Sequence, residues 1–245
     1  PNIDKINALN LGLDDWLMAV VDATAPHVCA FKPQIAYFAA LDAEDELADI
    51  IDYIHDNHPD IPVILDAKRG DIGTTAAQYA SEAFDRFDAD AVTVNPYMGG
   101  DTLLPYSERA DKGVVVLCKT SNAGSGELQN LTLDNGHKLF EQVAINANQK
   151  WNGNNNLLLV VGATYPEELK KIRQLAGDMP FLIPGIGAQG GDVEATLSAG
   201  LRTDGKGLII SSSRGIIYAG DTAENFATKA QQASEALQQL INSCR

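Results

Sequence analysis

The sequence predicts an α/β fold in which parallel strands alternate with helices. Short runs rich in Val, Ile and Leu alternate with longer amphipathic stretches along the whole chain. Several of these runs are apolar almost throughout, which is typical of parallel strands that are covered on both faces. With 245 residues, 45% of them hydrophobic, the chain is long enough to bury a full core. These observations favour either a (β/α)8 barrel or a doubly wound sheet.

Each element is assigned from its pattern and its punctuation. Continuous apolar runs predict seven strands, namely Val28–Pro33, Val63–Lys68, Ala91–Asn95, Gly113–Lys119, Leu157–Gly162, Phe181–Gly185 and Leu208–Ser212. Amphipathic stretches predict helices at Asp14–Ala23, Asp45–Asn57, Thr75–Arg86, Asn135–Trp151, Pro166–Ala176, Asp192–Ser198 and Ala223–Ile241. The pattern contains no interdomain linker, so we expect residues 1–245 to form a single domain. Seven strands are one fewer than a closed eight-stranded barrel needs.

The charge of the chain limits the partners that it can bind. A formal net charge of -15 disfavours nucleic acid and an anionic membrane surface, because both require basic protein surface. An anionic small molecule must therefore be held by a few well-placed cations. The three cysteines show no paired spacing, and no apolar run approaches roughly 18 residues. We expect a cytoplasmic protein that acts on a small molecule.

The strongest chemical signal follows the apolar run that begins at Val63. Asp66 and Lys68 are two residues apart, so in a regular strand they face the same side, at its carboxyl end. Asp71 follows on the turn, and Lys32 ends the preceding predicted strand. Active sites of barrels are built at the carboxyl ends of the strands. The alternative is a structural network of salt bridges at a strand end, since buried charges must be paired.

The neighbouring carboxylates indicate what kind of lysine Lys68 is. Carboxylates beside an amine favour its ammonium form. A lysine that forms a Schiff base requires the opposite, a lowered pKa. Lys68 is therefore predicted to act as an acid or as an electrostatic stabiliser, and a carboxylate beside it can crowd an anionic group of the substrate that is to be expelled.

A second signal lies near the last two predicted strands. Residues 185–190 match a GxGxxG pattern, and Asp204 lies where a ribose-binding acid would be in a dinucleotide site. That motif normally belongs to the first βα unit, and here it follows the penultimate strand. A phosphate site is favoured instead, with Gln189, Gly190 and Arg214 as donors, because barrels hold phosphate in the loops after their last two strands. The alternative is that the glycines serve only tight turns.

Two further features are weighed without being assigned a site. His55 and His58 are three residues apart on a predicted helix, where a solvated face is favoured over a metal site. The polar turn at 119–126 is either a mobile lid or a surface loop.

The segment Asp66–Thr75, which reads DAKRGDIGTT, resembles the signature of the orotidine 5′-phosphate decarboxylases, in the subgroup whose motif reads DAKRGDIG. Further matches to that family occur in order along nearly the whole chain, at residues 30–33, 120–122, 161–164, 184–191 and 213–215. The resemblance implies a TIM (β/α)8 barrel. It also implies decarboxylation of orotidine 5′-monophosphate to uridine 5′-monophosphate in de novo pyrimidine biosynthesis, with no metal and no cofactor.

The resemblance also implies roles for single residues. Lys68 would stabilise and protonate the C6 carbanion, Asp66 would lie beside the departing carboxylate, and Lys32 would complete the charge array. Ser121 matches the residue that binds the pyrimidine, and Gln189, Gly190 and Arg214 match the phosphate grip. Family members are homodimers with shared active sites. In them, the residues that correspond to Asp71 and Thr75 reach from one subunit into the active site of the other.

The start of the chain departs from the family pattern. A first strand ending in Leu-Asp-Pro normally precedes the first helix, and its Asp contacts the ribose. Here the sequence begins with Pro1-Asn2-Ile3-Asp4. We therefore expect the first strand, absent from this sequence, to lie upstream of it.

Two other functions remain open at this stage. A related barrel that decarboxylates or condenses a sugar phosphate shares the Asp-x-Lys-x-x-Asp strand but usually needs Mg²⁺. A catalytically silent nucleotide-binding protein is the second alternative.

Overall fold

The computed structural model describes residues 2–186 and 192–245. The chain divides into two compact units, of which the first comprises Pro1–Ala67, Ser81–Ala91 and Ser213–Ser243. The second comprises Lys68–Ala80, Val92–Ser212 and Cys244–Arg245. That residues 1–245 form a single domain stays a prediction.

The strands form one sheet whose spatial order equals their order in the sequence, β1-β2-β3-β4-β5-β6. The bounds are β1 Ile64–Arg69, β2 Ala91–Val94, β3 Gly113–Lys119, β4 Leu157–Val161, β5 Phe181–Pro184 and β6 Leu208–Ser211. Pairing from β3 through β6 is parallel. A doubly wound sheet reverses its strand order at a switch point. The order found here has no such reversal, so it is the order of a barrel.

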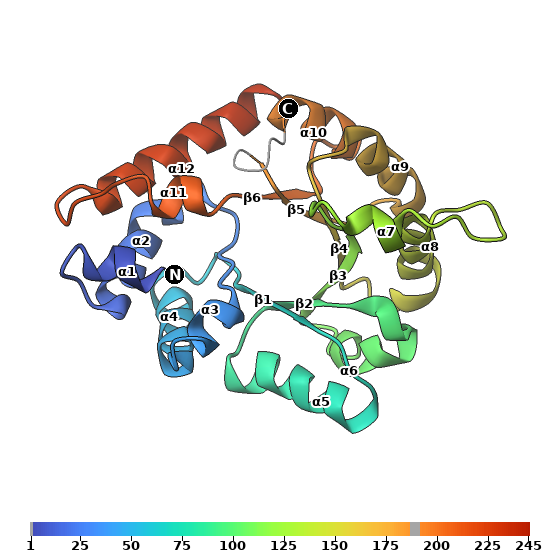
Figure 1. The fold of residues 1–245 in the computed structure, drawn as a ribbon, viewed down its shortest axis with the longest axis horizontal. Helices are drawn as coiled ribbons and strands as arrows, with labels where there is room; N and C mark the ends of the chain where they lie inside the picture. The colour runs from blue at the N-terminus through green and yellow to red at the C-terminus, as the bar shows by residue number, and fades with distance from the viewer. Residues whose placement is uncertain (1, 187–191) are drawn as a thin grey trace. The chain divides into compact units, whose positions relative to one another are not determined.

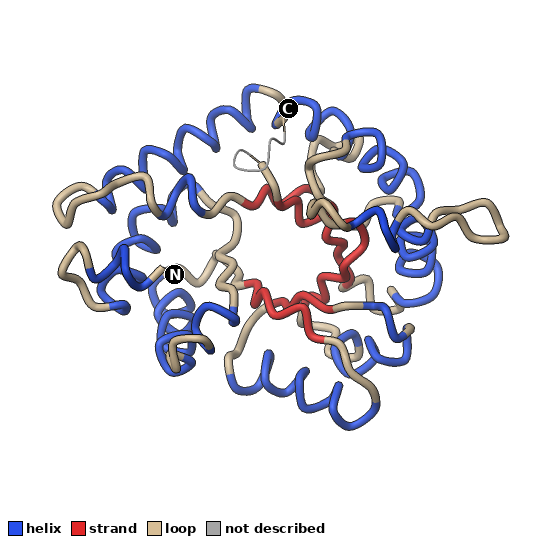
Figure 2. The backbone as a smooth tube through the Cα atoms, in the orientation of Figure 1, coloured by secondary structure: helices blue, strands red, loops and turns tan. Residues whose placement is uncertain are grey.

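The sheet lies mostly in the second unit, where it curves and carries helices on its outer side (Figure 1; Figure 2). The main helices of this unit are α5 Gly73–Ser81, α7 Ser125–Gln129, α8 Leu139–Asn146, α9 Pro166–Ala176 and α10 Val193–Gly200. A shorter helix, α6, covers Leu104–Ser107. Central strand residues such as Val115, Leu159 and Ile183 are completely buried. Six of the seven predicted apolar strands are thereby confirmed.

The first unit is built mainly from helices. They are α1 Ile3–Asn7, α2 Leu13–Thr24, α3 Ile35–Ala39, α4 Glu44–Asn57, α11 Arg214–Ile217 and α12 Phe226–Ser243. Helix α12 packs against α2, although most of the chain separates them in sequence (Figure 1). Ile6, Trp16, Val20 and Phe226 form the buried core of this contact.

The predicted strand Val28–Pro33 is not formed as such. Phe31 and Gln34 make only isolated parallel bridges, to Val63 and Asp66. Pro33 has no N–H to donate to a ladder, and Gln34 caps the N-terminus of α3 with its side chain. The segment therefore runs beside β1 for a few residues and then turns into a helix.

Two predicted helices also differ in detail. The helix predicted at Thr75–Arg86 begins at Gly73 and changes to π-helical hydrogen bonding over Glu82–Arg86. The helix predicted at Asn135–Trp151 begins only at Leu139, because Lys138 pairs with Thr132 in an antiparallel bridge. Sequence periodicity detects such helices but not the turns that delay their start.

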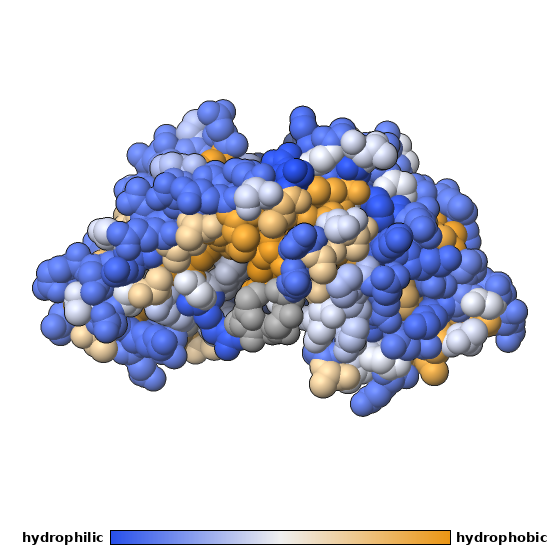
Figure 3. Space-filling view, turned by 90° about the horizontal axis from the view of Figure 1, so that it is seen from above, coloured by the Kyte–Doolittle hydropathy of each residue, from blue (hydrophilic) through white to orange (hydrophobic). Residues whose placement is uncertain are grey.

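Burial decreases at the last strand of the sheet. All four residues of β6 are only partly buried, whereas those of β2 are fully buried. Figure 3 shows one face of the molecule on which apolar side chains gather in a continuous area.

Candidate active site

The first component of the site is an ion pair in the first unit. Lys32 Nζ lies 2.9 Å from Asp66 Oδ2, and the two side chains are 19% and 11% exposed. Backbone pairing positions them, because Asp66 N donates to Pro33 O at 2.8 Å and Ile64 N donates to Phe31 O at 2.8 Å. Asp66 is the third of the six residues of β1, so the pair lies within the strand, and Lys68 is the residue nearer its carboxyl end.

Lys68, two residues further along β1, has an unusual backbone conformation. Its φ is +50°, in the left-handed region that a lysine rarely adopts. The Lys68 N–H donates to Thr93 Oγ1 of β2 at 2.9 Å, and the Lys68 side chain is exposed. Strained backbone of this kind clusters at functional sites, where the surroundings hold it in place. The positive φ also departs from the extended geometry on which the expected alternation of Asp66 and Lys68 depends.

The glycine after this strand allows a close approach of the backbone. A Cβ at Gly70 would lie 3.2 Å from the carbonyl oxygen of Asn95 and 3.3 Å from its Cβ. Asn95 N in turn donates to Arg69 O at 2.8 Å. The turn that carries Lys68 and Asp71 is therefore packed tightly against the end of β2.

Asp71 and Thr75 lie on this turn and on the first part of α5. Asp71 Oδ1 accepts the N–H of Ile72 at 2.8 Å, and Thr75 N donates to Ile72 O. Thr75 and Ile72 are exposed. Both predicted residues are thus held at the surface of the second unit, on the same short segment.

Ser121 follows the end of β3 and is packed against the end of β4. A Cβ at Gly162 would lie 3.0 Å from Ser121 Cβ and 3.1 Å from Ser121 N. Gly162 N donates to Lys119 O at 2.8 Å, which joins the two strand ends. The absence of a side chain at residue 162 thus allows the Ser121 backbone to approach β4.

Only part of the predicted phosphate grip can be described. Arg214 is the first residue of the short helix α11 in the first unit, and it is exposed. Gln189 and Gly190 lie outside the described residues.

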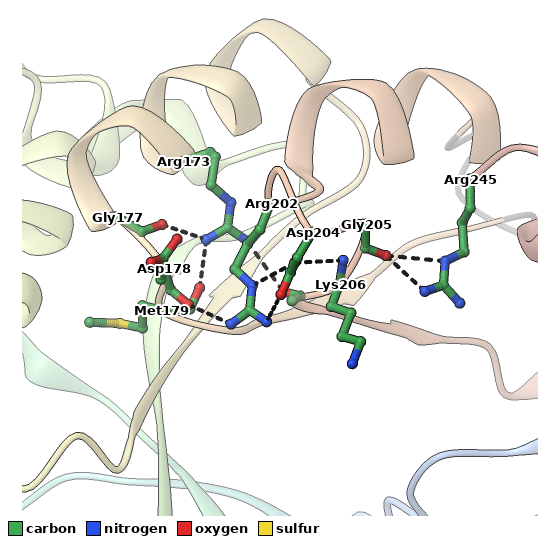
Figure 4. Close-up of polar contacts among 10 residues, drawn as sticks. Arg173, Gly177, Asp178, Met179, Arg202, Asp204, Gly205, Lys206 and Arg245 are labelled. Carbon is green, nitrogen blue, oxygen red and sulfur yellow. Dashed lines mark hydrogen bonds and ion pairs between the residues drawn. The ribbon is translucent and has the colours of Figure 1, made fainter.

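Asp204 has a structural role that argues against a dinucleotide site. Its carboxylate pairs with Arg202 at 2.7 Å, and Asp204 Oδ1 also accepts the N–H of Lys206 (Figure 4). The pair lowers the pKa of Asp204, with the hydrogen bond from Arg202 as the main cause. Both oxygens of this acid thus have partners within its own turn, before β6.

The remaining polar features of the sequence do not form a metal site. His55 contacts Asp90 at 3.2 Å, and His58 contacts Asp22 at 2.9 Å. Within residues 2–186 and 192–245, no group of three or more His, Cys, Asp or Glu side chains could hold a metal ion. In the same ranges no helix is long and apolar enough to cross a membrane.

A pocket of about 220 Å³ in the first unit lies among other residues. Its lining includes Lys5, Trp16 and Tyr218, and it contains none of the predicted site residues. The Lys5 ammonium lies 4.5 Å from the centre of the Tyr218 ring, so this cation already has a partner.

Two residues that support the site are missed by the sequence reasoning. Thr93 is almost completely buried, and it fixes the Lys68 backbone from the neighbouring strand. Lys119 is also buried, just before Ser121. A polar residue that interrupts or ends an otherwise apolar strand is the signal that both share.

A singly wound α/β sheet with a lysine–aspartate pair and a further lysine on β1 fits an enzyme of the (β/α)8-barrel class. The model of the Orotidine 5′-phosphate decarboxylase / HUMPS family matches residues 6–228. The chain belongs to this family.

Individual relatives agree with the family assignment. The chain is 56% identical over 246 residues to the orotidine 5′-phosphate decarboxylase of Dechloromonas aromatica, covering 99% of this chain and 90% of that protein. It is 57% identical over 227 residues to the Ralstonia pickettii protein of the same name, covering 93% of this chain and 83% of that one.

Solved structures give the same result for the fold. The Leishmania donovani OMP decarboxylase superimposes with a TM-score of 0.85 at 41% identity, over 94% of this chain and 86% of that one. The Methanocaldococcus jannaschii orotidine 5′-monophosphate decarboxylase has a TM-score of 0.73 at 20% identity, over 96% of both chains. The prediction of a TIM-barrel α/β fold is confirmed.

Proposed function

We propose that the chain decarboxylates orotidine 5′-monophosphate to uridine 5′-monophosphate, in de novo pyrimidine biosynthesis, without a metal or cofactor. The single observation that carries the proposal is the Lys32–Asp66 pair at 2.9 Å, two residues before Lys68 on the same strand. Family membership supplies the reaction class.

The proposed chemistry uses charges that the chain itself supplies. The bond between C6 and the carboxylate breaks, CO₂ leaves, and the electron pair stays on C6. The Lys68 ammonium stabilises that developing charge and then gives its proton to C6. The Asp66 carboxylate lies beside the departing carboxylate and disfavours the ground state, while Lys32 balances the charge of Asp66. Fixed charges of this kind stabilise a transition state without reorganisation.

The remaining predicted residues would hold the parts of the substrate that do not react. Ser121 binds the pyrimidine, and Gln189, Gly190 and Arg214 bind the phosphate. Binding energy from the remote phosphate then serves to orient the base.

We also propose a homodimer in which Asp71 and Thr75 of one chain reach the active site of the other. Two large apolar side chains of the same unit are exposed near this turn: Ile72, which follows Asp71, is 60% exposed, and Tyr97, two residues after the Asn95 that packs against Gly70, is 76% exposed. Exposed apolar side chains that gather together are typical of a protein interface. Sedimentation of the wild type and of Ile72→Asp/Tyr97→Asp, with turnover of each, tests the proposal. A wild type that stays monomeric while fully active would contradict it.

A spectrophotometric assay of orotidine 5′-monophosphate consumption tests the proposed reaction. We expect wild-type turnover with and without EDTA, and a loss of about 10³-fold in Lys68→Ala, which lies within the range for a general acid. Turnover that EDTA abolishes would favour the related sugar-phosphate barrels. Tight binding of uridine 5′-monophosphate without release of CO₂ would favour a silent nucleotide-binding protein.

A further inference from the structure

The second unit contains a buried ammonium group that the proposed chemistry does not use. The Lys119 side chain, at the end of β3, is 2% exposed. Its Nζ donates to Ser125 Oγ at 3.2 Å and to Asn130 Oδ1 at 3.1 Å, and it lies 3.7 Å from Glu168 Oε2. A charge of this burial is tolerated only when it is paired and hydrogen-bonded, and Lys119 meets both conditions.

A local irregularity of the sheet accompanies the placement of Lys119. The register between β3 and β4 is regular from Val114 to Leu117 and then shifts before Lys119 pairs with Val161. Such bulges re-aim a side chain relative to the alternation of the strand.

The partners of Lys119 close the segment 120–130 into a loop that is fastened at both ends. Asn130, which ends the loop, binds the ammonium, and so does Ser125 at its middle. Gln129 joins the two ends a second time, since its Oε1 accepts the Thr120 N–H at 2.9 Å and its Nε2 donates to Thr120 Oγ1 at 2.8 Å. These contacts favour an anchored loop over a freely moving lid.

Ser121 lies inside this closed loop, two residues after Lys119. On one side Gly162 packs against its backbone, and on the other the loop returns through Gln129 to the neighbouring Thr120. The segment that carries Ser121 is therefore closed by the contacts of Lys119 with Ser125 and Asn130.

We infer that Lys119 is a positioning residue that sets the place of the substrate-binding Ser121 by anchoring the loop 120–130 through Ser125, Asn130 and Glu168. The inference rests on the proposed function for the role of Ser121, but the anchoring itself does not. The two parts are therefore tested by separate measurements.

Hydrogen exchange on the ligand-free protein tests the anchoring. Loss of hydrogen bonds to a charged group should raise exchange of the 120–130 segment in Lys119→Met by about tenfold or more. Lys138→Met is the matched control, because Lys138 lies 3.7 Å from the same Glu168 but is 42% exposed. It should leave exchange of this segment unchanged. Equal exchange in Lys119→Met and wild type would overturn the inference.

A double-mutant cycle tests the route through Ser121. If Lys119 acts through Ser121, the double variant Lys119→Met/Ser121→Ala should lose no more kcat/KM than the more impaired single variant. Lys119→Arg should recover most of the loss, because it restores the charge and the donors. Additive losses would show that Lys119 serves stability alone and would overturn the inference.

Milder variants keep the test decisive if Lys119→Met does not fold. Asn130→Ala removes one acceptor of the ammonium, and Gly162→Ala places a methyl group 3.0 Å from Ser121 Cβ. Both variants should lower kcat/KM. When either is combined with Ser121→Ala, the loss should be smaller than the sum of the two single losses. If wild type consumes no orotidine 5′-monophosphate, the proposed function fails, while hydrogen exchange still decides whether Lys119 anchors the loop.

Discussion

Lys32 Nζ and Asp66 Oδ2 lie 2.9 Å apart, although 34 residues separate them in the sequence. Parallel bridges from Phe31 to Val63 and from Gln34 to Asp66 hold the two backbone segments side by side at this point. The pair is therefore a product of backbone pairing, and its strength depends on partial burial. Removing one member leaves the other charge poorly solvated.

Lys32→Met should cost both activity and stability. The variant removes the Lys32 ammonium from an Asp66 carboxylate whose side chain is only 11% exposed, so we expect a loss of about 3 kcal/mol in the free energy of unfolding. Urea denaturation with an activity assay measures both effects. Lys32→Met/Asp66→Leu is the control: it should regain stability but not activity. A single variant as stable as wild type would contradict the prediction.

Lys68→Gly should be more stable than Lys68→Ala. At φ +50° a residue with a Cβ is strained by about 1 kcal/mol or more, and glycine is not. Because the Lys68 side chain is exposed, its removal costs little packing. Chemical denaturation should show a higher midpoint for Lys68→Gly, while both variants lose most of their turnover. Identical midpoints would mean that the backbone is relaxed at this position.

Thr93→Val should impair catalysis through the Lys68 backbone. Thr93 Oγ1 accepts the Lys68 N–H at 2.9 Å and is almost completely buried. Valine has nearly the same shape but no acceptor, so we expect a loss of about 1–3 kcal/mol in stability and a lower kcat. Thr93→Ser retains the oxygen and should stay close to wild type in kcat. Equal kcat in Thr93→Val and Thr93→Ser would show that the hydrogen bond that Thr93 accepts from the Lys68 backbone does not affect catalysis.

Asp14→Asn should raise Tm slightly at pH 7. Asp14 is exposed, and limited desolvation, followed by the charges of Glu46, Asp49 and Asp15, raises its pKa above the ordinary value of 3.8. Between 3.8 and the raised value the folded state binds more protons than the unfolded state, so stability falls as pH rises through that window. The asparagine variant lacks this penalty.

The pH profile checks the sign of that effect. The Tm advantage of Asp14→Asn should be largest at neutral pH and should vanish below about pH 3.8, where the carboxyl group is protonated in both states. Asp60→Asn, at an exposed aspartate outside this acidic group, is the control. If the Tm advantage of Asp14→Asn persists unchanged at low pH, the raised pKa of Asp14 is not its cause.

The sequence by itself determined the fold class and the identity of the chemical groups. Near-continuous apolar runs become buried strands because their composition needs cover on both faces, wherever the helices lie. The DAKRGDIG segment identifies the charged residues of β1 and of the turn after it, and it indicates the protein family. Side-chain alternation was less dependable, because it assumes extended backbone, and Lys68 has a φ of +50°.

The tertiary structure alone decided how these groups are held. No local pattern reveals that Thr93 of β2 accepts the Lys68 N–H or that Asn130 returns to Lys119, because both contacts join residues whose separation in space depends on packing. The same holds for the segment 28–33, whose apolar composition predicts a strand. The proline at residue 33 and the helix that follows limit it to isolated bridges. Local sequence sets which conformations a residue prefers, and only packing decides which partner lies beside it.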